Sequence, residues 1–104
     1  MPGHPKGPMG LSYSEPLQFD AQGRATVEKT VPSIGIKVNI RGWIEGAEAV
    51  YNILLESPDR HEWRGVGPEQ EITREIRLNW GSTKIKAVVI SDKPNTSAVF
   101  HLTA

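Results

Sequence analysis

This chain has no cysteine, no excess of charge of either sign and no long apolar run. The absence of cysteine excludes disulfides, thiol catalysis and cysteine-ligated metal centres. Twelve basic residues balance twelve acidic ones over 104 residues, whereas a nucleic-acid-binding domain usually gathers a basic excess on one face. A transmembrane helix needs about 20 consecutive apolar residues. We therefore expect no nucleic-acid partner and no membrane insertion.

Recognisable catalytic and metal-binding motifs are also lacking. The three histidines, His4, His61 and His101, do not have the short spacing that pairs of metal ligands usually show. Ser57 and Asp59 lie close to His61, but a Ser-Pro-Asp sequence is typical of a turn. The chain has no Gly-x-Ser-x-Gly nucleophile elbow. The sequence predicts a protein that is not an enzyme and holds no metal or cofactor.

What the chain does contain is a repeated alternation of apolar and polar residues. Over residues 72–80, Ile72, Ile76, Leu78 and Trp80 fall on one side, and Arg74 is the exception on that side. Successive side chains of a strand point to opposite faces of a sheet, so this stretch predicts a strand with one buried face. Other strands are predicted at 17–19, 24–31, 34–44, 83–91 and 96–103, and residues 60–66 predict either a short edge strand or an ordered loop.

Residues 49–56 are apolar on both sides, so their periodicity fits a central strand or a short helix. The Val, Tyr and Ile side chains favour the strand, and a helix over 45–55 is the alternative. Residues 81–82, Gly-Ser, predict a hairpin turn. Seven or eight short strands with a turn about every ten residues are typical of an antiparallel β-sandwich.

The predicted fold is therefore all-β, with a single antiparallel sandwich. It resembles immunoglobulin-like and fibronectin type III domains in architecture, and the alternative is a small β-barrel of the OB type. Residues 1–13, rich in proline and glycine, predict a flexible tail, and residues 14–104 predict the single domain. The tail has no apolar core of the kind found in a signal peptide, and the sequence leaves the compartment open.

The three tryptophans have different expected surroundings. Trp80 ends the strand at 72–80 on its apolar side, which predicts a core position. Trp43 falls out of phase with the isoleucines of its strand. Trp63 lies among charged residues in a segment bounded by proline and glycine. The polar surroundings of Trp43 and Trp63 predict partial exposure.

Exposed aromatic residues beside hydrogen-bonding groups bind sugars or partner proteins. Trp43 and Trp63, with Glu62 and Arg64 as polar partners, are thus the candidate binding residues. The alternative is that both indoles cover the end of a sheet or pack under the tail.

Two functions remain. We favour a non-catalytic interaction module that binds a protein partner or assembles with copies of itself, docking through an exposed edge such as 60–66 or the final strand. The second hypothesis is a carbohydrate-binding module that uses the exposed tryptophans.

Overall fold

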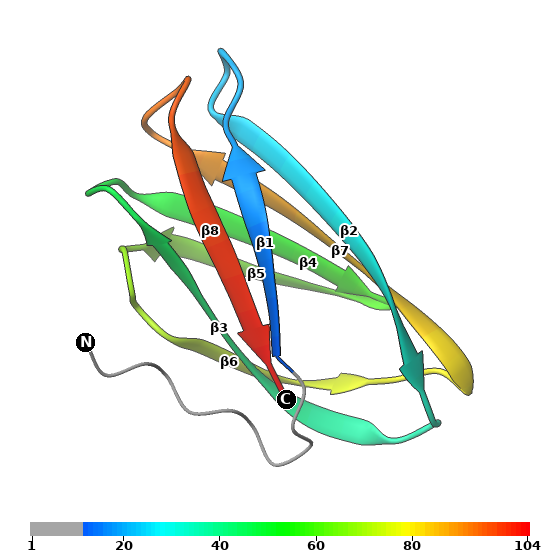
Figure 1. Ribbon diagram of the computed structural model, residues 1–104. Helices are drawn as coiled ribbons and strands as arrows, with labels where there is room; N and C mark the ends of the chain where they lie inside the picture. Colours follow the sequence, from blue (N-terminus) through cyan, green and yellow to red (C-terminus); the bar gives the residue numbers. More distant parts are fainter. Residues whose placement is uncertain (1–11) are drawn as a thin grey trace.

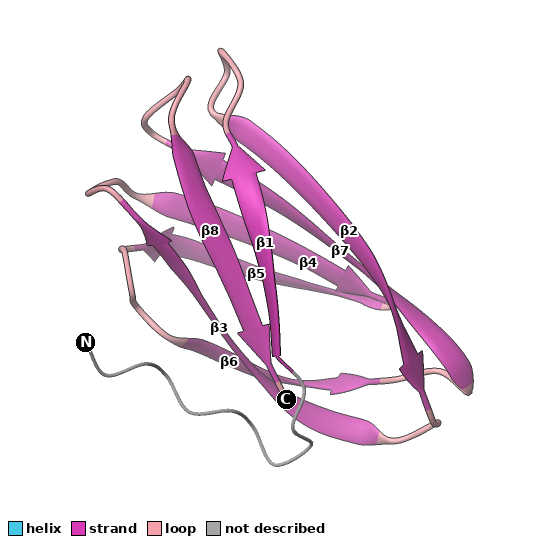
Figure 2. Cartoon of the chain, in the orientation of Figure 1, coloured by secondary structure: helices cyan, strands magenta, loops and turns pink. Residues whose placement is uncertain are grey.

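The computed structural model describes residues 12–104, so residues 1–11 of the predicted tail lie outside the described part. The described residues form strands joined by turns and loops (Figures 1 and 2). None of their segments is a helix long and apolar enough to cross a membrane. The strands are β1 (Ser12–Gln18), β2 (Arg24–Ser33), β3 (Lys37–Gly46), β4 (Tyr51–Ser57), β5 (Asp59–Val66), β6 (Ile72–Arg77), β7 (Gly81–Ser91) and β8 (Ser97–Thr103).

The strands form two packed antiparallel sheets. The first sheet has the order β1-β8-β3-β6, and the second has the order β2-β7-β4-β5. The predicted β-sandwich is therefore confirmed. Two separate four-stranded sheets are found in place of the alternative OB-type barrel.

The order in which the chain visits the two sheets defines the topology. Every connection except the β4–β5 hairpin crosses from one sheet to the other. This order is that of a jelly roll, the eight-stranded double Greek key. An immunoglobulin sandwich shares the two-layer architecture, but its strands are distributed as ABED and CFG. Residues 81–82 were predicted to form a hairpin turn, but β6 and β7 lie in different sheets.

Alternate side chains from both sheets meet in one core. In β3, Val38, Ile40 and Ile44 are buried, and in β6, Ile72 and Ile76 are buried. Burial of apolar surface between the two layers is the main stabilising contribution in such a sandwich. The largest fully buried apolar side chains are Phe19, Leu17, Ile44, Ile53, Leu55, Ile76, Val66 and Val89.

The segment that allowed a helix is a strand. β4 lies between β7 and β5, and it forms antiparallel ladders with both. Tyr51, Ile53 and Leu55 point into the core, while Asn52 is exposed. Its β-branched and aromatic side chains fit this half-buried pleated surface, which outweighs the helical alternative.

The positions of the first and last strands differ from those predicted. β1 begins at Ser12, five residues before the predicted strand, so Ser12 and Tyr13 belong to the sheet and not to the tail. The final strand, β8, was proposed as a docking edge, but it lies between β1 and β3. Its backbone hydrogen-bonding groups are used by these two neighbours, so β8 offers no edge for another strand.

The four edge strands carry features that hinder pairing with another chain. β1 contains Pro16, and β2 contains Pro32 and the exposed Lys29. β5 carries charged residues, and its ladder with β4 is irregular between Tyr51 and Ile53. β6 has only six residues. Proline, charge, irregularity and short length are the usual protections of a sheet edge.

Candidate functional site

Trp43 does not provide the exposed platform expected from the sequence. It lies on the outward side of β3, opposite His101 of β8, and the two rings stack with centroids 5.1 Å apart and planes at 19°. Only 7% of Trp43 is exposed. The polar neighbours in sequence correctly indicated an outward direction, but the indole is buried there.

Trp63 is half-buried and packs against the core. The guanidinium of Arg74 lies over its ring, 4.7 Å from the centroid, and His61 lies beside it with ring centroids 6.3 Å apart. Arg74 was the polar exception on the apolar side of its strand. Its place over an aromatic face explains that exception, because a guanidinium is attracted to the ring's negative face.

Glu62 and Arg64 alternate with Trp63 along β5, so their side chains leave the opposite face of the sheet. They pair with each other at 3.3 Å between Glu62 Oε2 and Arg64 Nη2. The four predicted binding residues therefore do not form one site. Trp43 is buried in the first sheet, Trp63 faces inward from the second, and the Glu62–Arg64 pair faces outward.

Trp80 was predicted to lie in the core, but it is 79% exposed. The alternation of residues 72–80 continues beyond the strand itself, which ends at Arg77. Leu78 is still buried, and the chain then turns toward the other sheet. Trp80 therefore lies in a connection at the end of the sandwich where β2 leads into β3 and β6 leads into β7 (Figure 1).

The exposed indole rests on the backbone of Gly35. A β-carbon at Gly35 would lie 2.5 Å from Nε1, 2.7 Å from Cδ1 and 2.9 Å from Cε2 of Trp80, so only glycine permits this approach. Ile34, beside it, is 52% exposed. We call Ile34, Gly35 and Trp80 the Trp80 tip.

Hydrogen bonds fix the two loops that form the Trp80 tip. Ile36 N donates to Ile34 O at 2.8 Å, which closes a tight turn around Gly35, and Leu78 N donates to Ile36 O at 2.8 Å. The second of these bonds joins the β2–β3 loop directly to the segment that carries Trp80. The tip is therefore held from both of its loops.

Thr83 forms a second set of bonds beneath the tip. Its buried hydroxyl accepts from Asn79 N at 2.8 Å and lies 2.8 Å from Ser33 Oγ. Ser33 Oγ in turn donates to Asn79 O at 2.6 Å. Both polar backbone groups of Asn79, the residue before Trp80, are thus satisfied. A backbone held in this way presents its next side chain with little conformational freedom.

A polar hollow lies where residues of β3 and β6 in the first sheet meet the start of β5 in the second sheet. It is lined by Lys37, Asp59, Glu75, Ile76 and Arg77. Lys37 and Arg77 lie opposite each other in the β3–β6 ladder. The hollow thus combines cationic and anionic side chains from both sheets.

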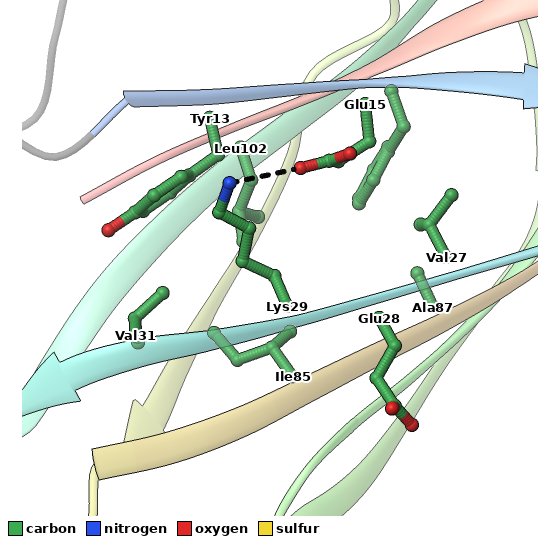
Figure 3. Close-up of a pocket in the computed structure, with 10 residues that line it drawn as sticks. Tyr13, Glu15, Val27, Glu28, Lys29, Val31, Ile85, Ala87 and Leu102 are labelled. Carbon is green, nitrogen blue, oxygen red and sulfur yellow. Dashed lines mark ion pairs between the residues drawn. The ribbon is translucent and has the colours of Figure 1, made fainter.

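Another hollow lies between β1 and β2 and is mainly apolar (Figure 3). The Lys29 side chain lies across its opening, with Nζ 3.4 Å from Glu15 Oε1 and 5.1 Å from the centroid of the Tyr13 ring. Its volume is about 30 Å³, which leaves room for no more than about two water molecules. We therefore do not regard it as a ligand site.

Within residues 12–104, no group of three or more histidine and acidic side chains is placed to hold a metal ion. The exposed residue that the sequence reasoning misplaced is Trp80. One signal available in the sequence was its position just before Gly81-Ser82, because a residue next to a turn is often exposed.

Comparisons with known proteins do not assign the chain to a family. No family model matches the sequence, and no curated protein matches it. Among solved structures, a family two carbohydrate esterase from Cellvibrio japonicus aligns with a TM-score of 0.30 and 9% identity, over 88% of this chain and 33% of that chain. The chain thus spans about a third of that protein, and a likeness this weak has no bearing on function.

Proposed function

We propose that this protein is an interaction module that binds a partner protein through the Trp80 tip. The observation that carries the proposal is the 79% exposure of Trp80 on a backbone fixed by hydrogen bonds. Exposing a large apolar ring to water is unfavourable, and burying it against a partner recovers that free energy. Tryptophan is among the residues most enriched at the energetic centres of protein interfaces.

Contact through side chains agrees better with the fold than contact through a strand edge. The edges carry proline, charge or irregular pairing, and β8 lies inside a sheet. Ile34, the neighbour of Gly35 in the chain, is a second exposed apolar residue of the Trp80 tip. An aliphatic side chain next to an indole favours a protein partner, because it adds apolar area and no hydrogen-bonding group.

Carbohydrate binding is the second candidate, and one specific observation favours it. Gly35 supports the indole at the five-membered ring, and the residue as a whole stays largely exposed. An exposed ring face suits a sugar when hydrogen-bonding side chains are also available. Lys37, two residues after Gly35 in the chain, lines the polar hollow with Asp59 and Glu75. This version of the hypothesis uses Trp80 in place of Trp43 and Trp63.

Photocrosslinking tests the protein-binding proposal. A benzophenone-bearing amino acid at position 34 places the reactive group at the tip and leaves Trp80 in place. The labelled protein is irradiated in an extract of the cells that make it, with increasing amounts of unlabelled wild type or Trp80→Ala. Specific binding predicts a product that wild type suppresses at much lower concentration than W80A. A product with the mass of two chains identifies self-association, and a product that both proteins suppress equally contradicts the proposal.

An NMR titration tests the carbohydrate candidate separately. Trp43, Trp63 and Trp80 should give three indole N–H signals in a nitrogen–proton correlation spectrum, and W80A assigns the third. Soluble polysaccharides are then added one at a time. A saturable shift confined to the Trp80 signal supports sugar binding at the tip. If no signal moves with any polysaccharide of the panel, this candidate is rejected.

A further inference from the structure

Three polar side chains meet on the outer face of the first sheet, away from the Trp80 tip. Ser14 Oγ of β1 lies 2.7 Å from His101 Nδ1 of β8. The other ring nitrogen, His101 Nε2, lies 2.8 Å from Glu45 Oε1 of β3. The three strands are neighbours in the order β1-β8-β3, so the register of the sheet brings these residues together.

The chemistry of the two bonds fixes the direction of each. A carboxylate only accepts hydrogen bonds, so His101 donates its Nε2 proton to Glu45. In the neutral imidazole Nδ1 then carries a lone pair, and it accepts the hydroxyl proton of Ser14. The hydroxyl is thereby hydrogen-bonded to a base, and that base is oriented by an acid. This is the arrangement that activates serine for nucleophilic attack, and it is recognised by geometry and not by sequence order.

The surroundings keep the imidazole in place and leave the serine accessible. Trp43 stacks on the His101 ring with centroids 5.1 Å apart, which restricts rotation of the imidazole. Ser14 is exposed. Among residues 12–104, β1 is an edge strand, so alternate backbone N–H groups along its outer side face no other strand of this described part. Such groups can donate to the oxygen of a reacting carbonyl.

We propose that Ser14, His101 and Glu45 form a hydrolytic site for small activated esters. This activity goes beyond the proposed binding function, and it departs from the expectation of a non-catalytic domain. Ser14 is the nucleophile, His101 is the general base and acid, and Glu45 and Trp43 are positioning residues.

The reaction proceeds through an acyl-enzyme. Ser14 Oγ attacks the ester carbonyl, and its proton passes to His101 Nδ1. The C–O bond to the leaving group then breaks, and the alcohol leaves with that proton. Water attacks the acyl-Ser14 while His101 accepts one of its protons, and the carboxylic acid is released as Ser14 regains its hydrogen. Each cycle consumes one ester and one water and needs no redox partner.

Covalent labelling with a fluorophosphonate tests the site directly. The full chain is treated with the reagent, and peptide mass mapping locates the adduct. We expect the adduct on Ser14. Ser14→Ala should abolish it, while the matched control Ser12→Ala, which removes an exposed serine from the same face of β1, should leave it unchanged. Failure to modify Ser14, or equal modification of other serines, overturns the proposal.

Kinetics separate a catalytic role from a structural one. The rate of p-nitrophenyl acetate hydrolysis is measured for the wild type and for His101→Gln. The glutamine amide still forms hydrogen bonds but cannot accept a proton. We expect kcat to fall by at least about 100-fold in H101Q, and we expect a smaller fall of kcat in Glu45→Gln with KM little changed. Circular dichroism confirms that each variant is folded. If S14A or H101Q hydrolyses the ester at the wild-type rate, the observed hydrolysis is a background reaction and the proposal is wrong.

Discussion

Trp80 lies against Gly35 so closely that a β-carbon at position 35 would be 2.5 Å from the indole nitrogen. The two residues come from different loops, and the contact fixes where the exposed ring stands. Gly35 does not have a positive φ, so what it provides is space and not backbone freedom. The missing side chain of Gly35 therefore allows the indole to pack directly on the backbone at this position.

Gly35→Ala should displace the indole without unfolding the protein. The atoms that a new methyl group meets belong to the exposed side chain of Trp80, which can swing away into solvent. We expect the Trp80 indole signal to shift, partner binding to weaken, and the free energy of unfolding to change by less than about 1 kcal/mol. Gly67→Ala is the matched control, because its nearest neighbour would be 3.8 Å away. An unmoved Trp80 signal in G35A would show that the indole does not pack against the Gly35 backbone.

Two buried threonines should respond in opposite ways to replacement by valine. Thr83 Oγ1 accepts a bond from Asn79 N and contacts Ser33 Oγ, so Thr83→Val leaves the part-buried Asn79 N–H without its acceptor and removes the contact with Ser33. We expect it to lower the free energy of unfolding by about 1–3 kcal/mol. Thr103 is equally buried, but its hydroxyl has no hydrogen-bond partner among the described residues. Thr103→Val should be neutral or stabilise by up to about 1 kcal/mol. Urea unfolding of both variants measures the contrast, and equal losses would contradict it.

The raised pKa of the buried Tyr51 phenol should make the free energy of unfolding depend on pH in the alkaline range. Burial raises the pKa of this phenol above the ordinary value of 10.0, and the negative charge of Asp92 adds to the effect. The folded protein therefore holds this proton more tightly than the unfolded chain does. The contribution to stability is complete below pH 10.0, the unfolded value, and is lost as the pH rises through the folded pKa.

The matched variant for this effect is Tyr51→Phe, which also removes the 3.3 Å bond to Ala47 O. The loss of that bond shifts stability by a constant amount at neutral pH. We expect the difference in the free energy of unfolding between wild type and Y51F to be flat up to about pH 10 and to fall above it. A difference that stays constant through the alkaline range would show that Tyr51 is not desolvated.

The sequence predicted the fold class because alternation depends only on neighbouring residues. It could not predict which strands lie side by side, since that depends on the order in which the chain crosses between the sheets. The final strand was therefore taken for an edge, although it lies between β1 and β3. Ser14 and His101 are 87 residues apart in sequence, and only the register of the sheet joins them.

Trp80 shows where local reasoning fails. The alternation of residues 72–80 places it on the buried side, but the strand ends at Arg77 and the chain leaves the sheet before Trp80. Periodicity gives the side on which a residue lies only while the strand continues. Trp43 shows the complementary case: its outward direction was predicted, but stacking on His101 and its burial were not.

The most direct test of the binding account is a competition curve at the Trp80 tip. Unlabelled wild type, Trp80→Ala and Val50→Ala each compete with the crosslinker-labelled protein for its partner. Val50 is 51% exposed and lies in the β3–β4 connection, at the other end of the sandwich (Figure 1). We predict that V50A competes like wild type, while W80A needs about 30-fold more protein for the same suppression. If the W80A and wild-type curves coincide, the Trp80 tip is not the binding surface.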